Sequence, residues 1–220
     1  GYTAGQLIST GIRNTIVGSL AGDALTTGIS NTFVGFNAGG AVTDRSYNTA
    51  IGDSALSTNV NGARNVAIGN AALATMNPAS DSDTYNVAIG YDAGTAVTTG
   101  IKNTIIGSLA GDALPTGEGS PAVGYAALST ETSGGKNTAI GSKSQNSVNN
   151  SGNGNNTSVG FESMSAATTA IGSTAIGSSC MSGVMTGDFN TAVGYLAGLS
   201  ITSGTRNVLM GAQAGDALLG

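Results

Sequence analysis

The chain has 220 residues with a formal net charge of −5, and only 9% of its residues are charged. Hydrophobic residues make up 40% and aromatic residues 5%, which excludes both a disordered chain and a thick core of large side chains. Because the chain has no His, it lacks the base of a Ser-His-Asp or Cys-His nucleophile and any histidine metal ligand. We therefore expect a protein that is not an enzyme, with no catalytic, cofactor-binding or metal-binding residues and no cofactor.

A tandem repeat organises the whole chain. A Gly closes each Asn-Thr-Ala-Ile-Gly-like segment, and ten of the twelve intervals between successive closing glycines are 17 residues long. The closing glycines are Gly1, Gly18, Gly35, Gly52, Gly69, Gly90, Gly107, Gly124, Gly141, Gly160, Gly177, Gly194 and Gly211. Insertions near 76–85 and 149–156 lengthen the other two intervals to 21 and 19 residues. The repeat predicts a single array over 1–220 with about 13 coils.

The three residues before each closing Gly predict a short strand. In chain order, these strands are expected at 15–17, 32–34, 49–51, 66–68, 87–89, 104–106, 121–123, 138–140, 157–159, 174–176, 191–193 and 208–210. Each follows Asn, or Ser in two copies, and carries Thr or Val first, except at Pro121, and Ile, Val or Met last. The Gly indicates a corner with positive φ, and stacked Asn side chains are expected to hydrogen-bond from coil to coil.

A second short apolar stretch follows each closing Gly, for example Leu20-Ala21-Gly22 and Ala55-Leu56. A second Gly then marks another corner in most units, at Gly11, Gly28, Gly62, Gly100, Gly117, Gly134, Gly187 and Gly204. Each unit is therefore predicted to form strand, corner, strand and corner. This is one coil of an all-β parallel β-roll or solenoid, stacked at the strand spacing of about 4.8 Å.

The two faces of the strand carry a prediction about assembly. Side chains alternate along a strand, so the Thr column and the Ile column share one face and the middle column points the other way. We expect the Ile face to fill the coil. The middle column would then form an outward stripe, apolar in all copies but Ser158. A strand that is apolar on both faces is normally covered on both, which predicts packing on other copies of the chain.

Two units depart from the repeat. Gly160–Gly177 contains an extra Thr169-Ala170-Ile171-Gly172, and Cys180 and Met181 then replace the usual Ala and Gly or Leu. The strand register is therefore least certain in the irregular coil over 160–181. Gly141–Gly160 has little apolar content, which predicts a protruding loop.

The repeat resembles two related groups of proteins. Segments such as Asn48-Thr49-Ala50-Ile51-Gly52 and Asn190-Thr191-Ala192-Val193-Gly194 resemble the tandem repeats of phage tail-fibre proteins and the head repeats of trimeric autotransporter adhesins. The resemblance implies a left-handed parallel β-roll assembled as a homotrimeric fibre. The 17-residue unit and the leading Asn look more like the phage fibre arrays than the adhesin heads, whose repeats are usually shorter.

Three functions follow from this reading. The first is a structural fibre-shaft segment of a virion appendage, a tail or head fibre on the virion surface. It would support host attachment and contact itself, other virion or fibre proteins, and a host cell-surface glycan or protein. The alternative is the head of a bacterial trimeric autotransporter adhesin at the cell surface. The third is an ice-binding solenoid, which the predicted burial of the Thr column opposes. A net charge of −5 argues against nucleic-acid partners. The chain contains no run of about 18 apolar residues, so membrane insertion is not predicted.

Several side chains outside the strands have two interpretations each. Cys180 is either a small residue in an Ala position or a reactive thiol, and Gly-Asp-Ala-Leu places Asp23, Asp112 and Asp216 either at polar corners or at a calcium site. Five basic residues precede the Asn column, either as a solvated edge or as a nucleic-acid contact that the net charge of −5 opposes: Arg13, Arg64, Lys102, Lys136 and Arg206. Six aromatic residues follow closing glycines, where they either pack at a corner or seam or stack on sugars: Tyr2, Phe36, Tyr91, Tyr125, Phe161 and Tyr195.

Overall fold

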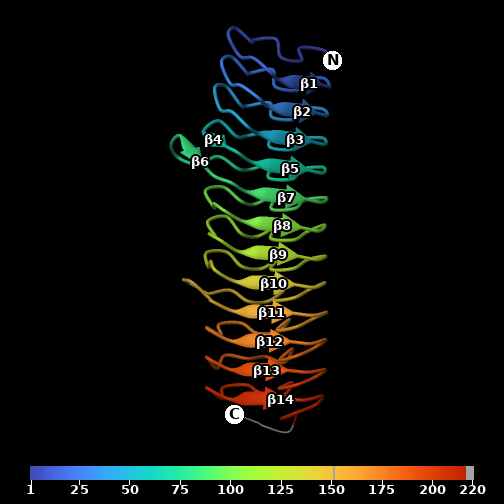
Figure 1. Cartoon of the computed structure of the whole chain (residues 1–220), viewed down its shortest axis with the longest axis vertical. Coiled ribbons are helices and arrows are strands. Elements are labelled where there is room, and N and C mark those ends of the chain that lie inside the picture. Colours follow the sequence, from blue (N-terminus) through green and yellow to red (C-terminus); the bar gives the residue numbers. More distant parts are fainter. Residues whose placement is uncertain (151, 217–220) are drawn as a thin grey trace.

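The protein is an all-β parallel β-solenoid built from tandem repeats. Its structure, a computed structural model, describes residues 1–150 and 152–216, and these contain no helix. Twelve three-residue strands stack into one parallel sheet along the long axis, with β1 and β14 at opposite ends (Figure 1). They are β1 (Thr15–Val17), β2 (Thr32–Val34), β3 (Thr49–Ile51), β5 (Val66–Ile68), β7 (Val87–Ile89), β8 (Thr104–Ile106), β9 (Pro121–Val123), β10 (Thr138–Ile140), β11 (Thr157–Val159), β12 (Thr174–Ile176), β13 (Thr191–Val193) and β14 (Val208–Met210).

The register of the sheet follows the repeat. Each strand pairs with the strands one coil before and after it, so eleven parallel pairings make about 11 turns of roughly 17 residues. Thr15 lies beside Thr32 and Val17 beside Val34, and the same columns continue to β14. The predicted strand positions are confirmed, because columns of β-branched residues suit a pleated surface with identical neighbours above and below.

The second predicted strand of each coil is wrong. The segment after the closing Gly forms tight turns in which every second residue has positive φ, as at Leu20 (φ 59°) and Leu56 (φ 54°). Its backbone still bonds from coil to coil, since Gly22 N–H donates to Ala38 O at 3.0 Å and Gly39 N–H to Ala55 O at 2.9 Å. The coil therefore closes through a turn rather than through a second pleated strand.

The predicted orientation of the strand faces is also wrong. The middle column points into the coil, where Phe33, Ala50 and Ile105 are fully buried, and the Thr and Ile columns point outward. The interior is narrow, and its larger middle residues lie against glycines of the turn. A Cβ on Gly39 would meet the ring of Phe33, and one on Gly111 would meet the side chain of Ile105. In the coil of Ala50 the turn instead buries Leu56. Close packing limits the side-chain volume that each coil can hold, so the column that is mostly Ala lies inside.

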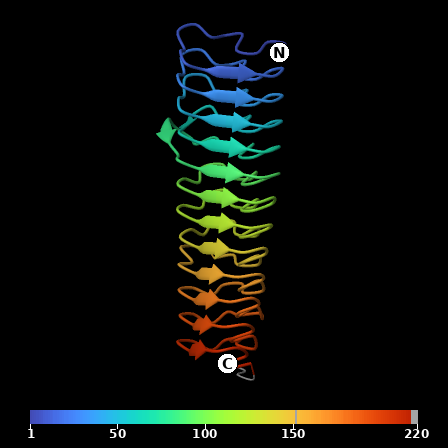
Figure 2. The same cartoon turned by 45° about the vertical axis from the view of Figure 1, so that its right-hand side comes forward.

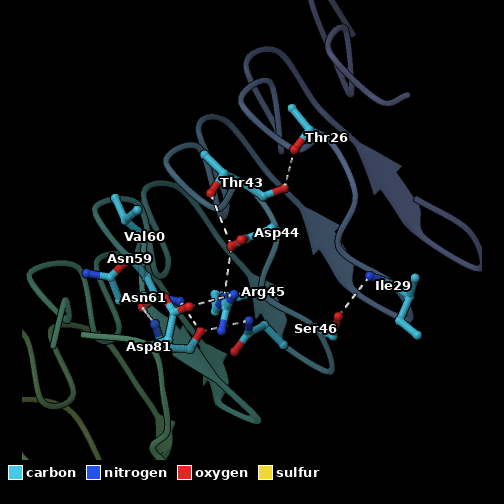
Figure 3. Close-up of polar contacts among 12 residues, drawn as sticks. Thr26, Ile29, Thr43, Asp44, Arg45, Ser46, Asn59, Val60, Asn61 and Asp81 are labelled. Carbon is cyan, nitrogen blue, oxygen red and sulfur yellow. Dashed lines mark hydrogen bonds and ion pairs between the residues drawn. The ribbon is translucent and has the colours of Figure 1, made fainter. Parts of the chain in front are cut away.

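Much of the first insertion, near 76–85, forms a protruding loop. Within it β6 (Ser82–Asp83) pairs with β4 (Gly62–Ala63) and stands out from the main stack (Figure 2). Arg45 bonds to Asp44 at 2.9 Å and to Asp81 at 3.1 Å and ties the loop to an earlier coil (Figure 3). The hydrogen bond from Arg45 holds the pKa of Asp44 below its usual value.

The second insertion corrects the predicted loop over 141–160. Ser144, Gln145 and Val148 are buried inside the coil, and the described residues that are exposed in this unit are Lys143, Asn149, Gly152, Asn153 and Asn155. Gln145 donates to Thr138 O at 2.7 Å, and Ser144 and Ser158 share a hydrogen bond. These polar side chains separate two apolar clusters, one ending at Ala139 and one beginning at Val148. A hydrogen-bonded polar layer therefore continues the core here.

The irregular coil contains two strand-like segments, 169–172 and 174–177, and the second of them forms β12. In the first copy Ala170 is buried and Ile171 is 37% exposed at the corner before the strand, where Ile171 N–H donates to Asp188 Oδ1 at 2.9 Å. Cys180 and Met181 occupy the buried Ala and Leu positions of the turn. The register of β11, β12 and β13 is unbroken, with Thr157, Thr174 and Thr191 in one column.

Glu131 is a fully buried carboxyl group beside the polar layer, and it gives stability a pH dependence. It accepts hydrogen bonds from Gly134 N–H at 2.7 Å, Asn137 Nδ2 at 3.1 Å and Asn150 N–H at 3.2 Å. Burial, opposed by these bonds, raises the pKa of Glu131. The folded protein thus binds this proton more tightly than the unfolded chain does. The stabilisation is complete below the unfolded pKa and is lost as pH rises through the folded pKa.

We expect Glu131→Gln to remove this pH dependence. Relative to the variant, the native protein should lose stability as pH rises from about 4 towards neutrality, because only the carboxyl group acquires a charge. Urea unfolding of both proteins across this range measures the difference. Glu118→Gln, which removes an exposed carboxylate, serves as the control. A native-minus-variant difference that stays constant with pH would contradict the prediction.

Candidate functional site

The outward face of the main sheet is the most distinctive surface of the molecule. Its outer columns are Thr or Val, with one Pro, at the first strand position and Ile, Val or Met at the third. None of these residues is buried, and Ile51, Ile89 and Ile140 are 37–40% exposed. In-register pairing places neighbouring side chains of each column about 4.8 Å apart. We call this surface the outer sheet face, defined by the first and third residues of β1, β2, β3, β5 and β7–β14.

A ladder of buried Asn side chains holds one edge of this face. Asn103 shows the pattern: its Oδ1 accepts from Ser120 N–H at 3.0 Å, and its Nδ2 donates to Gly117 O at 2.7 Å in the next coil. Asn48 makes the same two kinds of bond to Asn65 N–H and Gly62 O. The predicted coil-to-coil Asn bonds are confirmed, and they run mainly from side chain to backbone. Each Asn thereby fixes the start of the next strand.

The opposite edge is a row of glycine corners. Gly141 has a φ of 132°, and a Cβ there would lie 2.3 Å from Gly160 O in the next coil. The closing glycines from Gly18 to Gly211 share this backbone, with φ between 121° and 141°. The prediction of positive φ at these corners is confirmed. Two rigid edges thus keep the outer sheet face regular along the stack.

The basic column precedes the Asn ladder at an exposed corner of the coil, as predicted. All five of its residues have positive φ, between 58° and 63°. Arg64 pairs with Asp83 at 2.9 Å and lies over the ring of Tyr47, with the guanidinium carbon 4.7 Å from the ring centre. Arg206 lies similarly over Phe189, at 5.6 Å. Sequence reasoning missed these aromatic partners, which share the column one coil away.

The other candidate residues lie apart from one another. Cys180 is fully buried, donates to Ala192 O at 3.3 Å, and has a pKa raised to about 11 by burial. This confirms the structural interpretation of Cys180, because a reactive thiol needs an exposed, stabilised thiolate. Asp23 and Asp112 lie at corners beside the buried Leu25 and Leu114, and burial raises the pKa of Asp112.

Over the described residues there is no pocket and no group of three or more acidic, Cys or His side chains placed to hold a metal ion. Nor does any helix in residues 1–150 and 152–216 have the length and apolarity to cross a membrane. Fold and surface define the protein as a tandem-repeat β-solenoid with a regular, partly apolar outer sheet face. Comparisons with models of protein families, with curated proteins and with solved structures found no match to this chain.

Proposed function

We propose that the protein is a shaft segment of a homotrimeric virion fibre that supports host attachment, with the outer sheet face forming the contact between copies. The observation that carries the proposal is the third strand column, which is Ile, Val or Met in all twelve strands and ranges from half-buried to exposed. Eleven steps of about 4.8 Å make this stripe on the order of 50 Å long. Contiguous apolar patches of this kind mark interaction surfaces.

The correction of the strand faces strengthens the argument for assembly. The outward column was expected to be mostly Ala, but the third strand position is Ile or Val in eleven strands and Met in one, and burial of these larger side chains contributes more free energy. The thin interior supports the same conclusion, since most of its strand positions hold Ala. Three-fold symmetry, the left-handed coil and the virion setting come from the resemblance to phage fibre repeats. A bacterial adhesin head shares that resemblance and differs in the domains that flank the array.

An ice-binding solenoid is the second candidate, and one observation favours it. The Thr column was expected to face inward, but Thr15, Thr104 and most other members lie on the outer sheet face. A regular exposed Thr array is what such a function requires. Val66, Val87, Pro121 and Val208 interrupt the array, and the bulky third column accompanies it throughout. These features fit a protein contact better than an ice surface.

The oligomeric state tests the proposal. We expect the native chain to sediment as a trimer and the triple variant Ile51→Lys, Ile89→Lys, Ile140→Lys to sediment as a folded monomer, because three charges per copy cannot be buried unpaired at an interface. Analytical ultracentrifugation gives the mass, and circular dichroism checks the fold. Val184→Lys, at a residue 64% exposed outside the sheet, is the matched control.

Two outcomes would overturn the fibre proposal. If the native chain remains a folded monomer at all concentrations, the outer sheet face is not a subunit contact. If that monomer also shows thermal hysteresis, and the triple Lys variant lacks it, the ice-binding function is supported instead.

A further inference from the structure

A second surface, at the corner that follows each closing Gly, carries a regular row of aromatic side chains. The carbonyl of the residue after the Gly accepts a hydrogen bond from the next coil, for example Leu109 N–H to Tyr91 O at 2.9 Å and Lys143 N–H to Tyr125 O at 2.8 Å. Equivalent bonds of 2.8–3.1 Å join every coil from 91 to 196. The residues in this column therefore form an in-register ladder along the stack, as the strands do.

Aromatic residues and Ser alternate in this ladder over seven consecutive coils. The order is Tyr91, Ser108, Tyr125, Ser142, Phe161, Ser178 and Tyr195. A shorter tract of the same kind, Tyr2, Ser19 and Phe36, opens the chain. We call the seven-residue tract the aromatic–serine ladder. Its rings stand two coils apart, about 9.6 Å, and its hydroxyls lie halfway between them.

The rings of this ladder are presented to solvent. Tyr91, Tyr125, Phe161 and Tyr195 are 51–58% exposed, although burial of such side chains is normally favourable. In the described part of the chain the tyrosine hydroxyls make no hydrogen bond and no cation lies over these rings, whereas Arg64 and Arg206 lie over aromatic residues at the other corner. The hydroxyl groups of Ser108, Ser142 and Ser178, all in the described part of the chain, likewise make no hydrogen bond. The ladder thus offers open ring faces with serine hydroxyls between them.

We propose that the aromatic–serine ladder binds an extended β-1,4-linked polysaccharide lying parallel to the stack. The repeating disaccharide of such a chain is close in length to two strand spacings, so every second sugar ring meets an aromatic side chain. The apolar C–H face of a pyranose packs on the ring, and the serine hydroxyls bond to the sugar between. The charges that flank the ladder are Asp92 and the ion pair of Lys143 with Glu162, at 3.6 Å, so no unpaired cation among the described residues there is available to a nucleic-acid phosphate.

The inference deepens the proposed fibre function by naming the chemistry of the host surface, and it rests on that proposal for its biological setting alone. The ladder lies outside the outer sheet face. Polysaccharide binding and oligomeric state can therefore be measured separately, and the failure of one proposal leaves a different signature from the failure of the other.

Affinity electrophoresis of the full chain tests the inference. We expect soluble hydroxyethylcellulose to retard the native chain and glycogen, which is α-linked, to leave its mobility unchanged. Tyr125→Ala with Phe161→Ala should weaken the affinity for hydroxyethylcellulose by about tenfold or more, since two stacking contacts are lost. Tyr85→Ala with Phe189→Ala, which removes two rings of similar exposure at the other corner, should leave the affinity unchanged.

Length dependence supplies a second readout. Cello-oligosaccharides of six sugars should compete better than those of two, because a six-sugar chain spans several rings of the ladder. Three results would overturn the inference: no retardation of the native chain, equal weakening in both double variants, or equal competition by both oligosaccharides. Dissociation of the double variant Tyr125→Ala, Phe161→Ala into monomers would also overturn the inference, since the ladder would then be a contact between subunits.

Discussion

Gly141→Ala is expected to destabilise the solenoid strongly at the centre of the stack. At φ 132° an alanine is strained, and its Cβ would lie 2.3 Å from Gly160 O and 2.6 Å from Gly160 C. Neither atom can move without breaking the register of β10 and β11, where Ile140 and Val159 are partners. Backbone strain and overpacking together should cost roughly 2–6 kcal/mol. Urea unfolding measures the loss.

The loss of protection should be local, because each coil of a solenoid contacts its neighbours alone. Hydrogen exchange is expected to accelerate in the coils around 141 and 160 and to remain slow near 50. Gly119→Ala is the matched control: it also has positive φ, 64°, but a Cβ there meets nothing within 4 Å. The control should lose only about 1–2 kcal/mol, the cost of a left-handed backbone for Ala. Equal losses in the two variants would show that backbone strain, and not the close approach of coils, governs these corners.

Asn103→Ala is expected to have the next largest effect. The variant leaves Ser120 N–H and Gly117 O without their partners in a region that excludes water. Each unsatisfied buried group costs about 1–3 kcal/mol, so the free energy of unfolding should fall by about 2–6 kcal/mol. Thermal and urea denaturation check the result.

The Asn column itself contains Ser, which indicates how much stability a Ser replacement of Asn103 should retain. Ser120 occupies the position of Asn103 one coil later, and its hydroxyl accepts from Asn137 N–H at 3.4 Å, a longer bond than those of Asn. Asn103→Ser should therefore fall between the native protein and the Ala variant. Asn70→Ala, at an exposed corner, should change stability by less than about 0.5 kcal/mol. An equal loss of stability in the Asn70 and Asn103 variants would show that the hydrogen bonds of the Asn ladder are not the cause.

The candidate surfaces were only partly predictable. The aromatic column and the basic column are visible in the sequence, because each recurs at a constant distance from a closing Gly. Their exposure is not visible, since aromatic residues in a repeat are equally compatible with a core. The pairing of Arg64 with Tyr47 and Tyr85 also needed the structure, because contacts one coil away depend on how the corner turns.

The sequence by itself determined the period, the strand positions, the positive-φ corners and the Asn ladder. Each depends on a local requirement that repeats with the unit: only Gly tolerates the closing corner at Gly141, and only a short polar side chain such as Asn103 can bond both to the next strand and to the next corner. Such requirements are satisfied within one coil and its neighbour, so they leave a regular trace in the sequence.

The tertiary structure alone decided which face of the strand lies inside. Alternation with a period of two is unchanged when the two faces are exchanged, so the columns around Ala50 cannot distinguish core from surface. The choice depends on how the chain closes across the coil, where Gly39 leaves room for Phe33 and where Leu56 is buried in the coil of Ala50. The same closure placed Gln145 inside and Ile51 outside, because an interior of limited volume takes the column that is mostly Ala and leaves the bulkier column at the surface.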